Sequence, residues 1–346
     1  MRALVYGGPG VKEWRDVPDP VIVDATDAIV GVDTTTICGT DLHILKGDVP
    51  EVTKGRILGH EAVGTVEAVG DAVTNFRPGD RVLVSCISAC GRCRYCREGH
   101  YGQCRGGGGW VLGHLIDGTQ AEYVRIPFAD TSLYKLPATV NDEEAVMLSD
   151  ILPTSYEVGV LNGAVRPADV VAIVGAGPIG LAATLTARLL SPRHVLAIDL
   201  ADSRLEMAKQ FGADETINSG REDVVARVHA LTDDLGADVV IEAVGIPETF
   251  ELCTQLVRPG GHVANIGVHG KPATLALDKL WAANVTITTG LVDTYSTPTL
   301  LAMVASGQLS TLQFATHHFA LSDIQEAYAT FANAGTENAL KVVLTK

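Results

Sequence analysis

Four cysteines lie close together in the pattern C-x2-C-x2-C-x7-C, namely Cys90, Cys93, Cys96 and Cys104. Cysteines spaced this closely either form disulfides or bind one metal ion. Adjacent C-x2-C pairs suit a tetrahedral zinc site with Zn–S distances of about 2.3 Å. Because sulfur would fill all four positions, no position remains for a substrate, and we expect a structural zinc ion here.

Cys38 and His60 provide a second pair of possible metal ligands upstream. A catalytic zinc has three protein ligands and one open position. Cys38 would supply a thiolate and His60 a neutral imidazole, so the third ligand must come from another segment. Asp150 is the best candidate, and Glu61 competes with it, either as a ligand or as a group behind the ligands. These residue types indicate a metal site that stays open to a substrate.

A glycine-rich segment follows an apolar strand-like run and precedes a helical pattern. It reads Gly175, Ala176, Gly177, Pro178, Ile179 and Gly180. In this context G-x-G-x-x-G is typical of dinucleotide binding, because its glycines permit a tight turn and let a pyrophosphate approach the helix N-terminus. The next strand-like run ends at Asp199, whose carboxylate can accept hydrogen bonds from the ribose of NAD and would repel the 2′-phosphate of NADP. Arg204 could face the adenine or pair with a phosphate. We therefore expect NAD.

The composition disfavours several other classes of protein. The formal net charge is −15 and no basic tract is present, so nucleic-acid binding by a zinc-ribbon module is not expected. Seven cysteines, an odd number, and no secretory apolar segment after Met1 indicate a reducing cytoplasm. Residues 170–187 carry no charge, but glycines and a proline interrupt them, so we expect a strand, a turn and a helix and no membrane association.

The elements that must position these residues change in type along the chain. The first 150 residues read as short strands, such as 62–69 and 81–84, separated by turns. Beyond Pro153, strands alternate with helical patterns, which is typical of a parallel sheet built from βαβ units. These runs are 170–174, 179–190, 194–199, 203–211, 238–241 and 261–266. After Tyr295 the pattern is mixed and ends in a strand-like run at 340–344. We expect a cofactor domain inserted into a catalytic domain.

Together these motifs resemble the zinc-containing medium-chain alcohol dehydrogenases over essentially the whole chain, and a bacterial secondary-alcohol subgroup in particular. The resemblance rests on Cys38-Gly-Thr-Asp-Leu-His43, Gly59-His60-Glu61-Ala-Val-Gly64, Val69-Gly70, Gly79-Asp80-Arg81-Val82, the four cysteines and the glycine loop. It implies an α/β fold with a GroES-like, β-rich catalytic domain at 1–153 and 295–346, including a structural zinc lobe at about 86–105. It also implies a Rossmann doubly wound parallel sheet at 154–294 and an active cleft between the domains.

The resemblance assigns roles in the catalytic site. The implied catalytic zinc ligands are Cys38, His60 and Asp150. Asp41 would fix the ring of His60, and Glu61 remains either a ligand or a group behind the ligands. Thr40 corresponds to the hydroxyl that takes the alcohol proton, which would pass through the nicotinamide ribose to His43 and then to solvent. Many relatives have a cysteine at the position of Asp150, and this difference points to the secondary-alcohol subgroup.

The resemblance also assigns contacts with the dinucleotide. Thr154 would contact the nicotinamide, Lys341 would meet the pyrophosphate, and the backbone around Val268 and Val292 would hold the carboxamide. Some relatives have a phosphate-binding arginine at the position of Gly39, so cofactor affinity would depend more on Lys341 and on the helix terminus.

The expected function is that of an NAD-dependent zinc alcohol dehydrogenase, with two zinc ions per chain, that interconverts secondary alcohols and ketones by hydride transfer. Primary alcohol, polyol and amino-alcohol dehydrogenases on the same scaffold remain alternatives, as does a non-catalytic nucleotide-binding relative. Trp110 would form a wall of the substrate pocket or pack in the core, and Cys86 would line the pocket or act as a small buried apolar group. The expected partners are a small alcohol or ketone and further copies of the chain, as a tetramer or, second, as a dimer.

Overall fold

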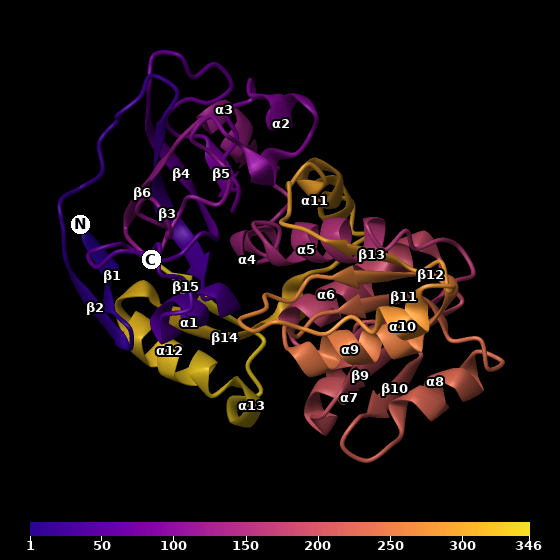
Figure 1. Cartoon of the computed structure of the whole chain (residues 1–346). Helices are drawn as coiled ribbons and strands as arrows, with labels where there is room; N and C mark the ends of the chain where they lie inside the picture. Colours follow the sequence, from indigo (N-terminus) through magenta and orange to yellow (C-terminus); the bar gives the residue numbers. More distant parts are fainter. The chain divides into compact units, whose positions relative to one another are not determined.

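The structure, a computed structural model, describes residues 1–346 and contains two compact units. Unit 1 comprises Met1–Asp150 and Val292–Lys346, and unit 2 comprises Ile151–Leu291. In Figure 1 the indigo and purple N-terminal segment and the yellow C-terminal segment both belong to unit 1. Neither unit contains a helix with the length and apolar character needed to cross a membrane.

A seven-stranded sheet forms the centre of unit 1. In spatial order its strands are β14 (Ala315–Ala320), β15 (Lys341–Thr345), β3 (Ala28–Thr36), β4 (Ala62–Val69), β5 (Arg81–Val84) and β7 (Leu133–Lys135), with β6 (Tyr123–Ile126) on β3. Strand β3 pairs antiparallel with β4, β6 and β15, and Val343 of β15 lies opposite Thr36. The last strand of the chain therefore completes a sheet that the N-terminal segment begins.

Shorter elements surround this sheet. A separate hairpin consists of β1 (Arg2–Gly8) and β2 (Val11–Asp16). The helices of unit 1 are α1 (Gly39–Lys46), α2 (Arg94–Arg97), α3 (Ala129–Ser132), α4 (Asp142–Val146), α11 (Thr297–Ala305), α12 (Ile324–Ala332) and α13 (Ala334–Glu337). Ile44 of α1 and Tyr328 of α12 share one hydrophobic core with Leu4 of β1. This core joins the first helix to the last long helix of the unit.

Unit 2 contains a six-stranded parallel sheet in the order β10-β9-β8-β11-β12-β13. Its strands are β8 (Val170–Val174), β9 (His194–Asp199), β10 (Glu215–Asn218), β11 (Ala237–Glu242), β12 (Val257–Asn265) and β13 (Thr286–Thr289). Numbered by their sequence within the unit, the strands stand in the order 3-2-1-4-5-6, which is the doubly wound arrangement. The predicted α/β class, with a β-rich domain and a Rossmann sheet, is confirmed.

Helices cover both faces of this sheet. They are α5 (Ile151–Thr154), α6 (Pro178–Ala187), α7 (Asp202–Gln210), α8 (Val224–Leu231), α9 (Pro247–Leu256) and α10 (Leu277–Leu280), with a π-helix at Ser155–Leu161. Along β8, Val170, Ala172 and Val174 belong to one hydrophobic core, and Val171 and Ile173 belong to another. Alternate residues of a strand point to opposite faces, so both faces are buried, as continuous apolar strands of a parallel sheet require.

The charge-free segment at 170–187 forms β8, a turn and α6, as predicted. Gly175 forms the turn with a φ of 102°, a conformation that glycine adopts at little cost. Pro178 is the first residue of α6, where its missing N–H does no harm and its fixed φ favours the helix. The sequence signals that interrupt a spanning helix are therefore the signals that build this turn.

Candidate functional site

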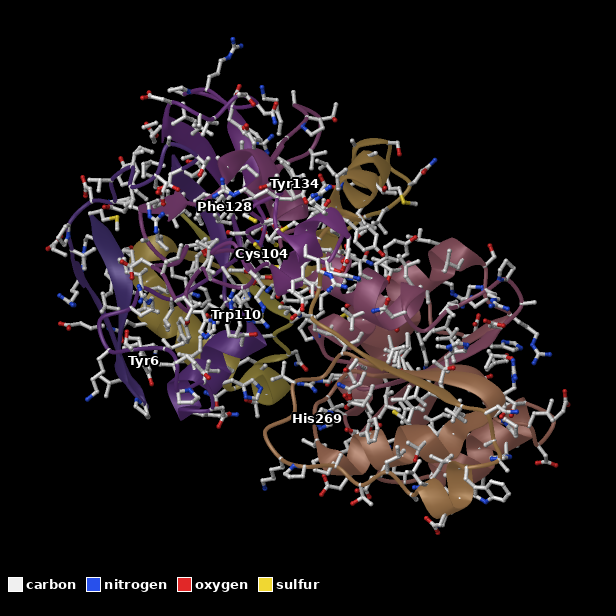
Figure 2. All side chains as sticks on the ribbon, turned by 45° about the horizontal axis from the view of Figure 1, so that its top comes forward. Tyr6, Cys104, Trp110, Phe128, Tyr134 and His269 are labelled. Atoms are coloured by element: carbon white, nitrogen blue, oxygen red, sulfur yellow. The ribbon has the colours of Figure 1, made fainter.

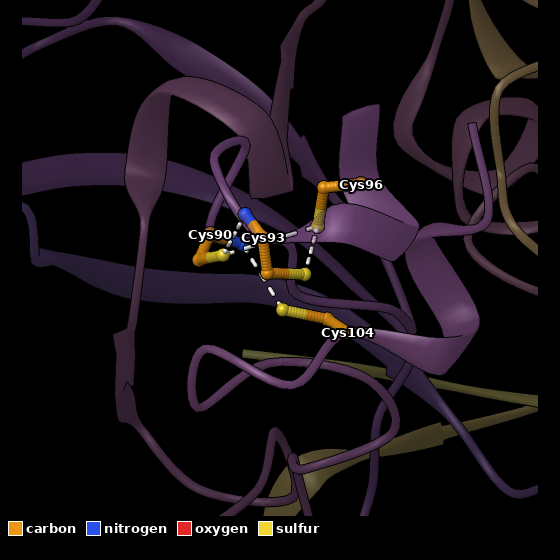
Figure 3. A group of neighbouring side chains, drawn as sticks. All are labelled: Cys90, Cys93, Cys96 and Cys104. Carbon is orange, nitrogen blue, oxygen red and sulfur yellow. Dashed lines mark hydrogen bonds between the residues drawn. The ribbon is translucent and has the colours of Figure 1, made fainter. Parts of the chain in front are cut away.

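The four cysteines of the lobe place their sulfurs around one point (Figure 3). The Sγ atoms of Cys93 and Cys96 are 3.5 Å apart, and those of Cys90 and Cys96 are 3.9 Å apart. Disulfide sulfurs are about 2.05 Å apart, whereas tetrahedral ligation with Zn–S bonds near 2.3 Å separates sulfurs by about 3.8 Å. All four cysteines, including Cys104, are free thiols. The lobe therefore fits a zinc ion with four sulfur ligands.

The backbone around this lobe favours thiolates. The N–H groups of Cys93 and Arg105 donate to the Sγ atoms of Cys90 and Cys93, each at 3.4 Å. Backbone N–H groups of Cys96 and Arg105 lower the pKa of Cys93 to about 6, whereas burial and the neighbouring cysteines raise the pKa of Cys96 to about 12. Gly106 fits only because it lacks a side chain, since a Cβ there would lie 2.4 Å from Cys90 Sγ. The lobe is a closed, tightly packed set of sulfur donors.

Cys38, His60 and Asp150 meet in unit 1, with ligand atoms all within 4.8 Å of one another. Asp150 Oδ2 lies 3.6 Å from Cys38 Sγ and 3.4 Å from His60 Nε2. Cys38 precedes α1, His60 precedes β4, and Asp150 follows α4, so three segments distant in sequence supply one donor each. A thiol, an imidazole and a carboxylate around one point fit a zinc ion that has three protein ligands and an open position.

The charges at this site favour a cation. Burial raises the pKa of the Cys38 thiol. Burial opposes protonation of His60, which is 4% exposed, but hydrogen bonds with Asp150 and Cys38 raise its pKa well above the ordinary value. The Asp150 carboxylate and the Cys38 thiol thus stabilise a positive charge on His60. A metal cation bound between the three side chains would supply a positive charge at the same place.

Asp41 supports Cys38, although the contact differs from the expected one with the His60 ring. Asp41 Oδ2 accepts hydrogen bonds from the backbone N–H of Cys38 at 2.9 Å and from Nε2 of Gln120 at 3.0 Å. Asp41 stands at the third position of α1, and Cys38 is the N-cap. The carboxylate therefore fixes the backbone of the candidate ligand at the start of the helix.

Thr40 and His43 lie on α1, beside Cys38. Thr40 Oγ1 is 3.7 Å from Cys38 Sγ, and His43 Nδ1 is 2.8 Å from Asp48 Oδ2. The side chain of His43 is 35% exposed, so its imidazole reaches solvent. Residues three apart lie on the same helix face, and α1 therefore carries a hydroxyl beside the candidate metal site and an imidazole nearer to water.

Glu61 and Lys341 form a buried ion pair in the same unit. Lys341 Nζ donates to Glu61 Oε2 at 2.5 Å and to the carbonyl of Ile37 at 3.4 Å, and the hydroxyl of Thr36 also donates to Oε2. Both charged side chains are 1% exposed. Burial opposes the charge of Lys341, but the Glu61 carboxylate raises its pKa above the ordinary value. This pairing differs from the expected pyrophosphate contact of Lys341, and the cluster of three candidate ligands does not include Glu61.

Trp110 and Cys86 lie beside the three candidate ligands. The rings of Trp110 and His60 meet edge to face with centroids 6.4 Å apart, and Cys86 Sγ lies 3.8 Å from Asp150 Oδ1. His114, to which no sequence pattern assigns a role, stacks on Trp110 with centroids 4.1 Å apart. Figure 2 labels Trp110 among the side chains of unit 1. A bulky apolar ring and a thiol thus lie next to two of the three candidate ligands, His60 and Asp150.

The glycine loop of unit 2 has the shape that a pyrophosphate needs. A Cβ at Gly180 would lie 1.8 Å from the carbonyl oxygen of Gly175, so only glycine lets α6 start this close to β8. A Cβ at Gly177 would meet no atom within 4 Å, so this side of the backbone is open. Asp199 accepts hydrogen bonds from the N–H groups of Ala176 and Ala201 at 2.8 and 2.9 Å, which ties the end of β9 to the loop. These residues fit a dinucleotide.

The other expected cofactor residues are distributed over both units. Arg204 Nη1 is 3.9 Å from Asp199 Oδ2, and Val268, which follows β12, is 63% exposed. Thr154 ends α5 in unit 2. Val292 is 3% exposed and is the first residue of the C-terminal part of unit 1. Asp199, Gly175 and Val268 follow or end parallel strands, at the carboxyl edge where open α/β sheets bind ligands.

Known proteins resemble the chain in sequence and in fold. Residues 24–138 match the alcohol dehydrogenase GroES-like domain, and residues 178–306 match the zinc-binding dehydrogenase family. An alcohol dehydrogenase of Cupriavidus necator is 39% identical over 365 residues, covering 99% of this chain and 98% of its own.

Two solved structures match over the whole chain. The apo form of zinc-dependent alcohol dehydrogenase 2 from Streptococcus pneumonia is 50% identical with a TM-score of 0.96, covering 100% of this chain and 98% of the other. The alcohol dehydrogenase TADH from Thermus sp. ATN1 is 39% identical with a TM-score of 0.93, covering 100% and 99%.

Proposed function

Because the chain belongs to the zinc-type alcohol dehydrogenase family and is an oxidoreductase, we propose that it interconverts secondary alcohols and ketones with NAD. The observation that carries this proposal is the cluster of Cys38, His60 and Asp150, whose three unlike donors leave a position for substrate. The open glycine loop at Gly177 supports dinucleotide binding in the same chain.

Cys38, His60 and Asp150 are the proposed ligands of a catalytic zinc, and the lobe is the proposed site of a second, structural zinc. A zinc ion at the first site supplies a Lewis acid that makes a bound alcohol easier to deprotonate. The four sulfur donors of the lobe leave no position for substrate, which supports a structural role. Glu61 holds the Lys341 ammonium behind the first site and thereby compensates a buried positive charge.

The chain's own residues then move the proton. We propose that the hydroxyl of Thr40, whose Oγ1 lies 3.7 Å from Cys38 Sγ, accepts the proton of the alcohol and passes on its own. The carboxylate of Asp48 accepts a hydrogen bond from Nδ1 of His43, which leaves Nε2 free to exchange a proton with water. Along α1, the hydroxyl of Thr40 would hold the proton near the substrate position and the imidazole of His43 would release it to solvent, so one helix carries both ends of the proposed proton path.

NAD supplies the hydride acceptor, and we propose that unit 2 binds it. Gly175, Gly177 and Gly180 leave the backbone open to a pyrophosphate, and Pro178 and Ile179 begin the helix that faces it. Asp199 supports NAD over NADP, because its carboxylate would repel a 2′-phosphate. The remaining proposed contacts are with Thr154, Arg204, Val268 and Val292. In the structure Lys341 forms an ion pair with Glu61, so we propose that it affects cofactor binding only through this pair.

The proposed domain division gives the GroES-like catalytic domain residues 1–153 and 295–346, and the Rossmann domain residues 154–294. Asp150 as the third ligand supports a secondary alcohol, and the ring of Trp110 beside His60 supports a small apolar substrate. We also propose a homotetramer, or failing that a dimer, in the reducing cytoplasm. The odd number of cysteines supports that compartment.

Initial rates of NAD and NADP reduction with 2-propanol and with ethanol test this proposal. We expect kcat/KM for 2-propanol to exceed that for ethanol by about tenfold, the range that one methyl group in an apolar pocket provides. The rate with NADP should be lower than that with NAD. Equal rates with both alcohols would contradict the substrate class, and no rate with either alcohol would direct the search to polyols and amino alcohols.

A further inference from the structure

A line of three hydrogen bonds, two of them buried and the last part-buried, leads from α12 to the backbone of Cys38. The hydroxyl of Tyr328 donates to Oε1 of Gln120 at 2.8 Å, and Nε2 of Gln120 donates to Oδ2 of Asp41 at 3.0 Å. The backbone N–H of Cys38 donates to the same oxygen at 2.9 Å. Tyr328, Gln120 and Asp41 are 2%, 0% and 1% exposed, so water does not compete for these groups.

Hydrogen bonds at both ends hold the Gln120 amide in one orientation. An amide has an oxygen that accepts and a nitrogen that donates, and its two ends have nearly the same shape. The hydroxyl of Tyr328 donates to the oxygen, so the nitrogen faces Asp41 and also donates to the carbonyl of Thr36 at 3.2 Å. A reversed amide would place its oxygen against the Asp41 carboxylate, and two acceptors would face each other. Asp41 and the Thr36 carbonyl therefore determine which end of the amide faces them, and the phenol, which donates to Oε1, holds the amide in that place.

Asp41 in turn depends on this support. Its carboxylate is buried, its Oδ1 has no hydrogen-bond partner, and its Oδ2 has only the Gln120 amide and the Cys38 N–H. A buried carboxylate that loses a charge-assisted hydrogen bond must move or attract another donor. Movement of Asp41 would shift Cys38, because Cys38 is the N-cap of the helix whose third residue is Asp41. The position of the thiol is thus linked to a side chain on the last long helix.

We propose that Tyr328 and Gln120 are positioning residues for the catalytic zinc, and that they act by holding the backbone of Cys38 through Asp41. This inference rests on the proposed function, since it requires that Cys38, His60 and Asp150 bind zinc. It assigns a role to helix α12, which supplies none of the proposed ligands. Groups that orient metal ligands typically change metal affinity by about 10- to 100-fold when they are removed.

The test compares Tyr328→Phe with the matched control Tyr6→Phe. Tyr6 is buried in the same hydrophobic core, but its hydroxyl has no part in the line of hydrogen bonds. The measurement is the rate at which each protein loses zinc to a chelator, with the zinc of the four-cysteine lobe as an internal reference. Hydrogen exchange of the Cys38 backbone N–H in the metal-free proteins gives a second readout that does not depend on zinc or on activity.

We expect Tyr328→Phe to release the catalytic zinc about tenfold faster than the wild type. Exchange at Cys38 should also become faster, while Tyr6→Phe stays within about twofold. A second variant, Gln120→Glu, keeps an acceptor for Tyr328 but places a carboxylate against Asp41. It should release the zinc faster still, by up to about 100-fold. Release from the lobe should be unchanged in every variant.

Equal zinc release and equal Cys38 exchange in Tyr328→Phe and Tyr6→Phe would overturn the positioning role. If one of the two variants in the line fails to fold, as thermal unfolding would reveal, the other is sufficient for the test. A wild-type protein that binds only the zinc of the lobe would instead overturn the proposed catalytic site. The two failures are therefore distinguishable: the zinc content of the wild type tests the catalytic site, and the comparison of variants tests the positioning role.

Discussion

The two candidate metal sites of unit 1 are built in opposite ways. The lobe uses four identical donors from one short segment, Cys90 to Cys104, and its sulfurs already have the spacing of a closed site. The other site uses three unlike donors from distant segments, Cys38, His60 and Asp150. Local turns are sufficient to assemble the first, whereas the second needs the sheet and helices of the whole unit. The lobe should therefore contribute stability, and the mixed site should contribute chemistry.

The largest expected effect comes from removing a donor of the mixed site. Cys38→Ser keeps the size of the side chain but replaces the thiolate with a poor zinc ligand. We expect kcat/KM for 2-propanol to fall by about 1000-fold, because metal stabilisation of the developing charge is worth several kcal/mol. The midpoint of thermal unfolding should change by no more than about 2 °C. A variant that keeps a tenth of the activity would show that Cys38 is not a ligand.

Removing a sulfur ligand of the lobe should lower stability and leave activity nearly unchanged. Cys93→Ser leaves three sulfurs and weakens a site whose metal ties the segment together. We expect a loss of about 3 kcal/mol in the free energy of unfolding, which lowers the midpoint by roughly 6–12 °C. The activity per folded molecule should stay within about threefold of the wild type, as rates measured below the transition would establish. A fall like that of Cys38→Ser, without a loss of stability, would contradict the distinction between the two sites.

A larger side chain at Gly177 should block cofactor binding without disturbing the fold. Gly177 has open space around it, and its φ is compatible with any residue, so Gly177→Val should leave stability almost unchanged. The side chain would occupy the approach of the pyrophosphate, and we expect KM for NAD to rise about tenfold. Gly335→Val, at another position with open space in unit 1, is the matched control and should leave KM unchanged. Equal KM values for the two variants would remove Gly177 from the cofactor site.

The smallest expected effect concerns Asp130, a carboxylate of α3 that accepts hydrogen bonds from Thr74 and Asn75. Burial would raise the pKa of Asp130, but hydrogen bonds from Thr74 and Asn75 hold it below the ordinary value. A carboxyl whose pKa is lower in the folded state stabilises the fold above the unfolded pKa of about 3.9. That contribution is lost as the pH falls through the folded pKa. Asp130→Asn should therefore cost at most about 1 kcal/mol at pH 7.

Urea unfolding at pH 7 and pH 3 measures this effect. The difference in the free energy of unfolding between the wild type and Asp130→Asn should narrow at the lower pH, because protonation removes the same interaction from the wild type. A difference that is the same at both pH values would mean that the charge of Asp130 contributes nothing.

The features that sequence alone could predict depend on local signals. Gly175 and Pro178 determine the strand, turn and helix of unit 2, and these were predicted because both residues act on their own backbone. The four cysteines are likewise near neighbours in sequence. Alternating strands and helices predicted the α/β fold for the same reason.

Other features depend on contacts between distant segments. Nothing in their spacing brings Cys38 and Asp150 together, and the residues alone left Glu61 as a competitor of Asp150 for the third ligand. Gln120 and Tyr328 stand in no motif, so their line of hydrogen bonds could be found only in the folded chain. Lysine is almost always exposed, and no sequence pattern indicated that Lys341 pairs with Glu61 inside the unit. The roles of Cys38 and Asp150 as ligands of a catalytic zinc remain predictions.

Stepwise removal of zinc tests the central claim, that one site performs chemistry and the other maintains structure. Zinc content, initial rate with 2-propanol and NAD, and thermal unfolding would be followed together during incubation with a chelator. We predict two zinc ions per chain, loss of activity with the first while the fold persists, and a lower unfolding midpoint with the second. Activity that survives removal of both ions, or that declines only as the fold is lost, would contradict this account.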